Sequence, residues 1–463
     1  MIQIEFLGAT REVTGSCYVL QVGKYRVLVE CGLIQGSQKN ETHNRDPFLF
    51  DPKSIDVVVL THAHLDHSGR LPLLIKEGYK GHVYTHRATV DLCAIMLEDA
   101  GYLNEKEVQW ENKKRERKGL KLIEPLYTRE EARKAHQHFR SLEYGKAEEI
   151  LPGVKLTLRD AGHILGSAIA EIELHEGNHS RQVVFSGDLG HQGSPILRDP
   201  EVVTKADLVI MESTYGDRQH RSWDKTWQEM GEIISSAHSG KGNILIPAFT
   251  VGRTQELLYM FKHYFNEWGI GDWEVFLDSP MGIEATEVYG KHAKVYDVEA
   301  KHIVEQSGNP FDLPNLHLSQ HSQDSTKINR KQSGAIIIAG SGMCTGGRIK
   351  HHLKHNIWRK QAHVMIVGFQ ARGTLGRALV DGAKYIRLWG ETIQVKAKVH
   401  TIGGLSAHAD QQGLMDWYHH FKKRPRVVLV HGEPEAMDAL AHRLKNEYHA
   451  DVVPANFQQK LTF

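Results

Sequence analysis

The chain has 463 residues, which is more than one ordinary hydrophobic core accommodates and predicts two domains. Hydrophobic residues make up 40% and charged residues 24% of the sequence, a balance typical of globular proteins, and the apolar runs are too short to span a bilayer. The net charge of +1 excludes a generic basic field for nucleic acids, so any such ligand needs local patches or metal ions.

The four cysteines are scattered along the chain, and none belongs to a CxxC motif. This spacing favours neither a disulfide framework nor a cysteine zinc site. The first five residues carry no positively charged segment, so we expect no secretory signal. We therefore expect a cytoplasmic protein without a membrane partner.

Alternating apolar and polar residues predict an antiparallel meander over residues 2–7, 16–22 and 25–30. Residues 56–60 form a Val/Leu run typical of a buried strand, which is followed by a histidine-rich turn and a helix over 69–77. The charged segment 100–147 predicts a helical excursion over the surface. Its basic run at 113–118 is interpreted as a solvated helix face, with an RNA contact as the alternative.

Four further strands are predicted at residues 155–160, 169–174, 182–186 and 208–212. The pattern then changes to four strand–helix units, with strands at residues 243–249, 274–277, 335–339 and 363–369. Such units indicate a parallel sheet with helices on its faces. Afterwards, strands at 393–400 and 426–431 flank a helix at 411–422. We therefore predict an α/β protein in which one domain, 217–389, is inserted between the two parts of another, 1–216 and 390–463.

A cluster of metal-binding side chains follows directly on the strand 56–60. His62 and His64 lie two residues apart in extended backbone, so their rings point the same way. Asp66 and His67 come after the chain has begun to turn and can face a second point. Imidazoles with carboxylates are a ligand set that zinc accepts, whereas the alternative is a surface histidine cluster.

One such motif cannot complete two metal sites, so other segments must supply ligands. His163 lies at a strand end in the segment AGHILGS, and Asp188 does so in SGDLG. Glycines beside a metal ligand let the backbone come close. Each segment alone is also compatible with an ordinary turn, but at the ends of neighbouring strands they form a set.

Taken in order, HxHxDH at 62–67, His163 and Asp188 resemble the successive motifs of the metallo-β-lactamase superfamily. The segments ESTYG at 212–216, SAH at 406–408 and LVHGE at 429–433 resemble the later motifs of its β-CASP branch. The resemblance covers nearly the whole chain and is strongest to bacterial and archaeal β-CASP ribonucleases and to the nuclease subunit of the cleavage and polyadenylation factor. It implies a metallo-β-lactamase αββα sandwich with an inserted β-CASP domain built on a parallel α/β sheet.

The resemblance also implies roles for residues of this chain. It implies two zinc ions, the first bound by His62, His64 and His163, the second by Asp66, His67 and His431, with Asp188 bridging them. A metal-bound hydroxide would attack the phosphodiester, and Asp66, Glu212 and His408 would be catalytic, the last two handling protons. Glu30 stands where the family usually has an Asp that orients a ligand histidine.

Three glycine-bearing strand-to-helix turns in the inserted domain each end in an arginine. Free N–H groups at such turns favour phosphate, although glycine is also common in ordinary α/β turns. The predicted substrate contacts are Arg253, Ser341, Gly342, Gly346, Arg348, Gly373, Thr374 and Arg377.

The sequence thus predicts a ribonuclease for single-stranded RNA, an endonuclease with 5′-exonuclease activity as a second mode. The alternatives are a hydrolase of DNA or of small phosphodiesters, and a non-catalytic RNA-binding subunit. All seven expected metal ligands are present, and His431 resembles the RNA-processing members of the branch, so both alternatives are less favoured. The sequence leaves the oligomeric state open, a homodimer included.

Overall fold

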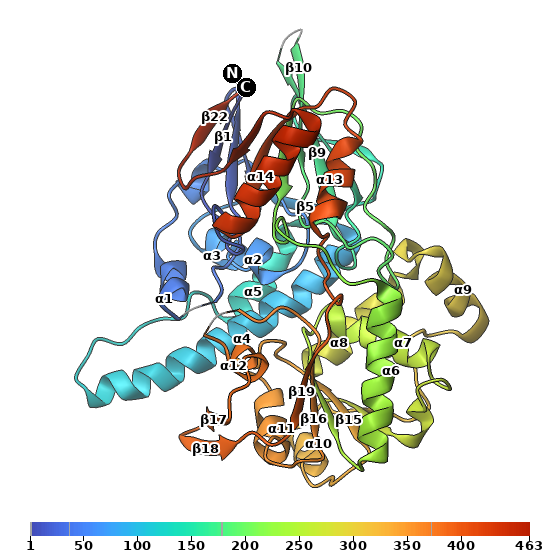
Figure 1. The fold of residues 1–463 in the computed structure, drawn as a ribbon. Helices are drawn as coiled ribbons and strands as arrows, with labels where there is room; N and C mark the ends of the chain where they lie inside the picture. Colours follow the sequence, from blue (N-terminus) through green and yellow to red (C-terminus); the bar gives the residue numbers. More distant parts are fainter. Residues whose placement is uncertain (1, 37, 177–178, 372) are drawn as a thin grey trace. The chain divides into compact units, whose positions relative to one another are not determined.

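The structure is a computed structural model that describes residues 2–36, 38–176, 179–371 and 373–463 (Figure 1). The chain divides into two units. The sandwich unit comprises Met1–Gln192, Arg198–Gln219 and His408–Phe463, and the sheet unit comprises Gly193–Leu197 and His220–Ala407. The sheet unit is therefore inserted into the sandwich unit.

The sandwich unit contains two seven-stranded sheets. The first has the order β22-β1-β2-β3-β4-β5-β6 and the second β21-β20-β11-β10-β9-β8-β7. The strands of the first are β1 (Ile2–Phe6), β2 (Tyr18–Val22), β3 (Tyr25–Val29), β4 (Val57–Val59), β5 (His82–His86), β6 (Phe139–Leu142) and β22 (Lys460–Thr462). Those of the second are β7 (Ala147–Leu151), β8 (Val154–Asp160), β9 (Ala168–Glu176), β10 (His179–Phe185), β11 (Leu208–Glu212), β20 (Arg426–Val430) and β21 (Val452–Pro454).

Buried apolar and partly exposed polar residues alternate along the strands, and this alternation explains how the two sheets pack. Ile2, Ile4 and Phe6 of β1 are buried in the core between the sheets, while the intervening polar residues are partly exposed. The strands β4 and β11 are instead buried along their whole length, which requires a cover on both faces.

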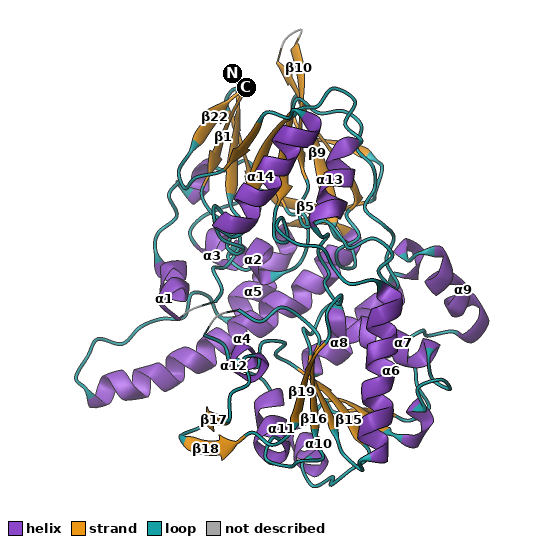
Figure 2. Ribbon diagram, viewed as in Figure 1, coloured by secondary structure: helices purple, strands orange, loops and turns teal. Residues whose placement is uncertain are grey.

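Helices supply this outer cover, as Figure 2 shows. Those of the sandwich unit are α1 (Gln38–Glu41), α2 (Leu65–Ser68), α3 (Leu71–Lys76), α4 (Arg87–Arg117), α5 (Arg129–Ala135), α13 (Gln411–His419) and α14 (Pro434–Tyr448). Apolar residues of α13 and α14 form one core cluster with β11 and β20, and α4 packs on β5 and β6. The predicted αββα sandwich is confirmed.

The sheet unit is built on six strands in the order β14-β13-β15-β12-β16-β19, and every neighbouring pair is parallel. They are β12 (Ile244–Pro247), β13 (Glu274–Leu277), β14 (Leu316–Leu318), β15 (Ala335–Ala339), β16 (His363–Ile366) and β19 (Lys398–Thr401). Its helices are α6 (Trp223–Ser239), α7 (Arg253–His263), α8 (Pro280–Lys291), α9 (Val298–Ser307), α10 (Ser322–Ile328), α11 (Ile349–Asn356) and α12 (Leu375–Val380).

The predicted parallel sheet is confirmed, and a hairpin of β17 (Tyr385–Leu388) and β18 (Glu391–Gln394) accompanies it. Short 3₁₀ helices lie at Thr42–Arg45, Pro52–Ser54, His136–His138, Ile270–Asp272 and Ala293–Val295.

Two predicted elements differ in the structure. The strand expected at 393–400 is divided between β18 and β19, because the N–H groups of Lys396 and Ala397 both bond to the Ile357 carbonyl and interrupt the ladder. Since β19 pairs with β16, the sheet unit continues to Ala407, beyond the boundary predicted at residue 389.

The second difference concerns the helical excursion predicted at 100–147. The helix α4 already begins at Arg87, and it ends at Arg117, shortly before Gly119 adopts a φ of 65°. Residues 139–142 form β6, because they pair with β5 in the first sheet. Within the described ranges, no helix combines the length and apolar character needed to cross a membrane.

Candidate metal centre

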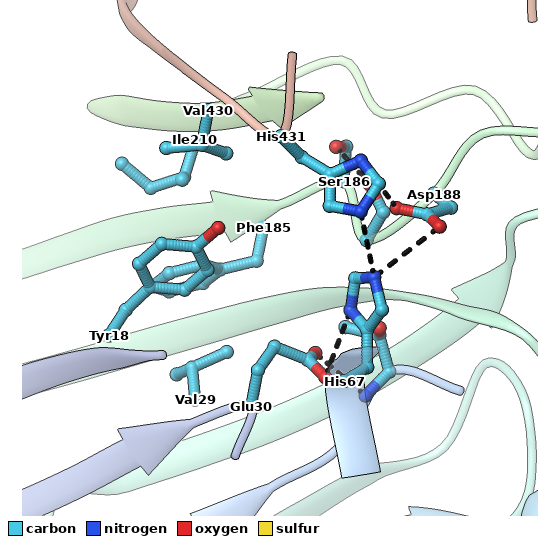
Figure 3. Close-up of a pocket in the computed structure, with 12 residues that line it drawn as sticks. Tyr18, Val29, Glu30, His67, Phe185, Ser186, Asp188, Ile210, Val430 and His431 are labelled. Carbon is cyan, nitrogen blue, oxygen red and sulfur yellow. Dashed lines mark hydrogen bonds and ion pairs between the residues drawn. The ribbon is translucent and has the colours of Figure 1, made fainter. Parts of the chain in front are cut away.

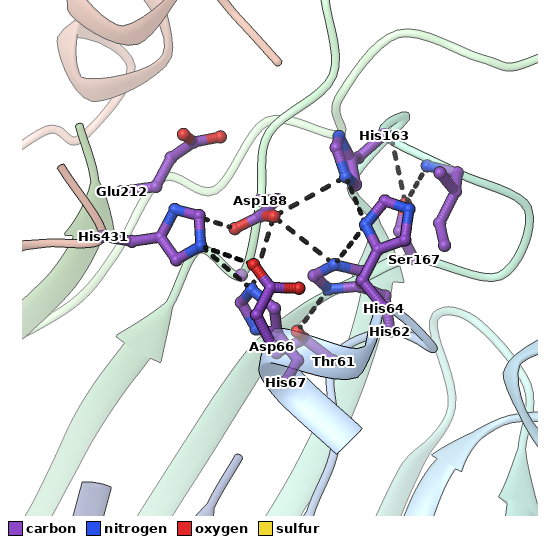
Figure 4. A network of polar contacts seen from close by, with 12 residues as sticks. Thr61, His62, His64, Asp66, His67, His163, Ser167, Asp188, Glu212 and His431 are labelled. Carbon is purple, nitrogen blue, oxygen red and sulfur yellow. Dashed lines mark hydrogen bonds and ion pairs between the residues drawn. The ribbon is translucent and has the colours of Figure 1, made fainter. Parts of the chain in front are cut away.

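The predicted metal ligands all lie in the sandwich unit, each just beyond the end of a strand. His62 and His64 follow β4 and lead into α2, which carries Asp66 and His67. The remaining three, His163, Asp188 and His431, follow β8, β10 and β20. Segments far apart in the sequence therefore converge at one edge of the two sheets, as Figure 4 shows.

Close backbone crossings make this convergence possible. A Cβ atom added to Gly32 would lie 1.7 Å from the carbonyl oxygen of Asp66, and one added to Gly190 would lie 2.0 Å from that of Gly162. Only glycine fits at such crossings. They hold the loops that carry Asp66 and His163 in place.

The first group of donor atoms consists of His62 Nε2, His64 Nδ1, His163 Nε2 and Asp188 Oδ2. His64 Nδ1 lies 3.2 Å from His62 Nε2 and 3.1 Å from His163 Nε2. Asp188 Oδ2 lies 3.4 Å from His62 Nε2 and 3.6 Å from His163 Nε2. Four ligands arranged tetrahedrally around zinc lie roughly 3.3–3.4 Å from one another. The spacing of these four atoms fits one metal ion.

The second group consists of Asp66, His67 and His431, and Asp188 Oδ2 lies next to it. His67 Nε2 lies 3.3 Å from His431 Nε2 and 3.4 Å from Asp188 Oδ2. Asp66 Oδ2 lies 3.5 Å from His431 Nε2. These distances also fit a tetrahedral ion. Asp188 Oδ2 thus belongs to the first group and adjoins the second through His67.

Neighbouring side chains orient the histidines through the ring nitrogens that do not belong to the donor groups. Thr61 Oγ1 lies 3.0 Å from His62 Nδ1, and Thr214 Oγ1 lies 3.0 Å from His431 Nδ1. The Thr214 hydroxyl donates to Glu212 Oε2 at 2.6 Å, so it accepts from His431 Nδ1–H and leaves Nε2 with a lone pair. Sequence reasoning missed both threonines, although Thr61 directly precedes the first ligand.

Glu30 fills the position predicted for it beside the ligands. Its Oε1 accepts from the Thr61 N–H at 3.0 Å, and its Oε2 lies 3.3 Å from His67 Nδ1. The residue is buried and has a φ of 63°, in the left-handed region where strain is stored at functional sites. The longer Glu side chain therefore still reaches the histidine.

Burial and charge together set the protonation of the donor atoms. Burial, reinforced by neighbouring histidines, lowers the pKa of His62 to about 3, and burial lowers that of His64 to about 4. Burial alone would raise the pKa of Asp188, but His431, His67 and His62 hold it well below its usual range. Neutral imidazole and ionised carboxylate are the forms that bind metal ions.

His67 differs from the other ligands in its electrostatics. Burial would lower its pKa, but Asp188 and Glu30 outweigh this and raise the pKa well above the ordinary value. A divalent cation bound between His67 Nε2 and Asp188 Oδ2, which are 3.4 Å apart, would displace such a proton.

Within the described part of the chain, three buried atoms of the centre make no hydrogen bond: Glu30 Oε2, His67 Nδ1 and Asp188 Oδ1. The cavity beside Asp188 has an apolar wall that includes Tyr18, Phe185 and Ile210 (Figure 3). A buried carboxylate with such a neighbourhood is costly unless a cation compensates it. The residues present therefore fit a metal centre.

Glu212 and His408 are brought together beside the metal ligands. Glu212 Oε1 accepts from the Leu189 N–H at 2.6 Å, and both carboxylate oxygens lie 3.2 Å from His408 Nδ1. Burial lowers the pKa of His408, but Glu212 and Asp188 outweigh it and raise the pKa to about 9. The side chain of His408 is 20% exposed, whereas that of Glu212 is buried, so the imidazole lies nearer the solvent.

Two of the arginines predicted to contact substrate form ion pairs and hydrogen bonds within the sheet unit. Arg253 is buried, pairs with Glu256 and donates to the Leu405 carbonyl at 2.9 Å. Arg348 donates to Asp278 Oδ1 at 2.7 Å and to two backbone carbonyls. Each guanidinium thus has partners within the chain, and a substrate contact of either arginine stays a prediction.

The other predicted contacts lie at the surface or in turns. Arg377 is partly exposed and pairs with Asp381 at 2.9 Å, while Thr374 Oγ1 accepts from the Arg377 N–H and caps α12. Ser341 Oγ accepts from the N–H groups of Thr345 and Gly346. A Cβ atom at Gly342 would meet the Phe249 ring, whereas Gly346 and Gly373 face open space.

An αββα sandwich with two adjoining His/Asp donor groups at one edge defines the metallo-hydrolase class. Three family models match the chain: "Metallo-beta-lactamase superfamily" over residues 10–238, "Beta-Casp domain" over 254–379, and "Zn-dependent metallo-hydrolase RNA specificity domain" over 392–454. The chain belongs to the β-CASP branch of the metallo-β-lactamase superfamily.

Individual relatives support this assignment. A ribonuclease of Thermus thermophilus is 41% identical over 438 residues, which is 94% of each chain. A transcription termination factor of Methanocaldococcus jannaschii is 34% identical over 443 residues, 93% of this chain and 67% of the factor. A crystal structure of a protein of unknown function from Enterococcus faecalis shares the fold, with 12% identity and a TM-score of 0.53 over 100% of each chain.

We predict that Glu30→Gln weakens zinc binding by about 10- to 100-fold, because the carboxylate that faces His67 Nδ1 becomes an amide. Competition against a fluorescent chelator measures the affinity. The exposed carboxylate of Glu433 offers a matched control, since Glu433→Gln removes the same charge two residues after His431. Equal affinities for Glu30→Gln and the unaltered protein would show that Glu30 does not support the centre.

Proposed function

We propose that the protein is a zinc-dependent ribonuclease that hydrolyses phosphodiester bonds of single-stranded RNA, as an endonuclease with a 5′-exonuclease mode. The observation that carries this is the pair of adjoining donor groups, with Asp188 Oδ2 lying 3.4 Å both from His62 Nε2 of the first group and from His67 Nε2 of the second. The choice of RNA is supported by the similarity to a ribonuclease and by the match to an RNA specificity domain.

We assign His62, His64 and His163 to a first zinc ion and Asp66, His67 and His431 to a second, with Asp188 serving both. Two bound zinc ions would supply Lewis-acid chemistry, neutralising phosphate charge and lowering the pKa of water. Asp66, as the carboxylate ligand of the second ion, belongs to the catalytic set. The apolar side chains behind the centre limit water there and keep these interactions strong.

We assign proton transfer to His408, with Glu212 as its positioning partner. Hydrogen bonds from Leu189 and Thr214 fix the Glu212 carboxylate, and the carboxylate fixes His408 Nδ1. A proton on His408 Nε2 can then be delivered to the alkoxide that leaves when RNA is cut. Such general acid catalysis contributes typically about 10²–10⁴-fold in rate.

The proposed activity is tested by incubating labelled single-stranded RNA and DNA of one sequence with the protein, with zinc, manganese and chelator. We expect RNA to be cut preferentially and RNA binding to weaken as salt rises, because phosphate contacts displace counterions. Internal fragments from a 5′-labelled strand indicate an endonuclease, and mononucleotides indicate an exonuclease. Equal or faster cutting of DNA would favour a DNA hydrolase instead.

We predict that zinc-reconstituted protein holds about two zinc ions per chain, since the donor atoms form two groups. Asp188→Ala should lose both ions and activity, whereas His64→Ala removes a ligand of the first group only and should retain one ion. Elemental analysis of both variants measures this. Retention of both ions and full activity by Asp188→Ala would refute the bridging role.

We predict that His408→Ala lowers RNA turnover by about 10²–10⁴-fold while both zinc ions and RNA affinity are kept. A nitrophenyl phosphodiester, whose leaving group needs no proton, should be hydrolysed almost normally. The exposed His442 provides a control, because His442→Ala removes an imidazole of the same unit. Loss of a zinc ion, or equal loss on both substrates, would assign His408 another role.

A further inference from the structure

The outer half of α4 is a surface that the metal centre does not use. The helix begins next to the centre, where Thr89 Oγ1 donates to the Gly166 carbonyl in the loop that carries His163. Its first half is packed, but beyond Gly101 only Val108 is buried. Figure 1 shows this outer half extending beyond the layers of the sandwich unit.

Aromatic and cationic side chains share one face of this outer half. At about 100° per residue, the following fall within an arc of about 120° and are named the α4 stripe: Tyr102, Lys106, Trp110, Lys113, Lys114 and Arg117. None of the residues in that arc, all of which are described, is acidic. Trp110 is 64% and Tyr102 44% exposed, so two large rings face solvent.

Two lysines of the stripe lie over its aromatic rings. Lys114 Nζ lies 3.0 Å from the Trp110 ring centroid, and Lys106 Nζ lies 5.4 Å from that of Tyr102. Residues 113–121 contain six cationic residues and one acidic residue, whereas the whole chain has a net charge of +1. Among the described residues, the stripe forms one ion pair, between Lys114 and Glu111 at 4.0 Å. The positive charge is thus concentrated and weakly neutralised.

The tip that carries this charge is held in a defined conformation. Asn112 exchanges two hydrogen bonds of 2.9 Å with the backbone of Ile123, and Arg115 donates to the Lys121 carbonyl at 2.7 Å. These bonds tie the returning segment to the helix. The stripe is therefore a preorganised surface, and ordering it adds little to the cost of binding.

We infer that the α4 stripe binds single-stranded nucleic acid, with bases stacked on Tyr102 and Trp110 and phosphates on the cationic side chains of the stripe. Stacking platforms combined with positive charge are how proteins bind single strands without reading sequence. That the strand is RNA rests on the proposed function. A second copy of this chain fits poorly, since two stripes facing each other would bring like charges together.

Distance along the helix separates this surface from the metal centre. Trp110 lies about 12 Å from Tyr102 and about 32 Å from Thr89 at 1.5 Å per residue. A long strand can occupy both places, whereas a small phosphodiester occupies only the centre. The stripe should therefore affect the binding of long RNA and leave the chemical step unchanged.

The test compares the zinc-loaded full chain with two variants, Trp110→Ala and the double substitution Lys106→Ala with Lys113→Ala, which removes two exposed lysines of the stripe. Fluorescence anisotropy of a labelled single-stranded RNA of about 30 nucleotides measures Kd across a salt series in the cold, with gels verifying intact strands. The control removes two exposed lysines elsewhere in the unit, Lys422→Ala with Lys423→Ala. Turnover of a nitrophenyl phosphodiester reports the integrity of the centre.

We expect Trp110→Ala to weaken RNA binding about 5-fold or more with an unchanged salt slope, since it removes stacking alone. The double lysine variant should weaken binding and reduce the salt slope by about 1.4, at roughly 0.7 per lost contact. KM for long RNA should rise with kcat unchanged, and the control should match the unaltered protein.

Unchanged Kd and salt slope in both variants would overturn the inference. A change in the oligomeric state of the variants with unchanged RNA affinity would also overturn it, because that result would indicate a protein–protein contact. The two proposals fail separately. If the protein cuts RNA but the variants bind normally, the stripe is wrong and the ribonuclease stands. If the variants lose strand binding while the unaltered protein cuts no RNA, the stripe stands and the ribonuclease fails.

Discussion

The sandwich unit is organised around one carboxylate oxygen. Asp188 Oδ2 has three imidazole nitrogens of His62, His67 and His163 within 3.4–3.6 Å, in an environment closed to water. So many lone pairs can face one another only if positive charge lies between them. In the proposed site, divalent cations on both sides of this oxygen would supply that positive charge. The close glycine crossings and the strained backbone of Glu30 and His431 are the features by which distant segments meet at this atom.

In this arrangement, different side chains around the metal centre have different roles. The threonines and Glu30 bind the outer nitrogens of three histidines, which fixes how their rings face Asp188. Glu212 is held by the backbone and by Thr214, and it in turn holds His408 at the more exposed side of the centre. Charge neutralisation and proton delivery are thus assigned to different groups. The outer half of α4 adds a third task, retention of the strand, at a distance from both.

Much of the centre could be predicted because its ligands lie at strand ends in short local motifs. The HxHxDH spacing and the glycine-flanked His163 and Asp188 carry their chemistry in adjacent residues. The internal partners of two predicted substrate arginines could not be predicted, because a Gly-Arg turn carries no information about its tertiary contacts. Arg348 is bound by Asp278, 70 residues earlier in the chain, and Arg253 is buried against Leu405. Similarly, the basic run on α4 could not be interpreted until the exposure of Trp110 and the position of Lys114 over its ring were known.

The central claim is that Asp188 Oδ2 joins two metal ions. Anomalous diffraction from crystals of the zinc-loaded protein, recorded on both sides of the zinc absorption edge, tests it directly. We predict two anomalous peaks about 3.5–4 Å apart, with Asp188 between them, one beside His62, His64 and His163 and the other beside Asp66, His67 and His431. A single peak at full zinc loading, or two peaks of which one has no contact with Asp188, would contradict it.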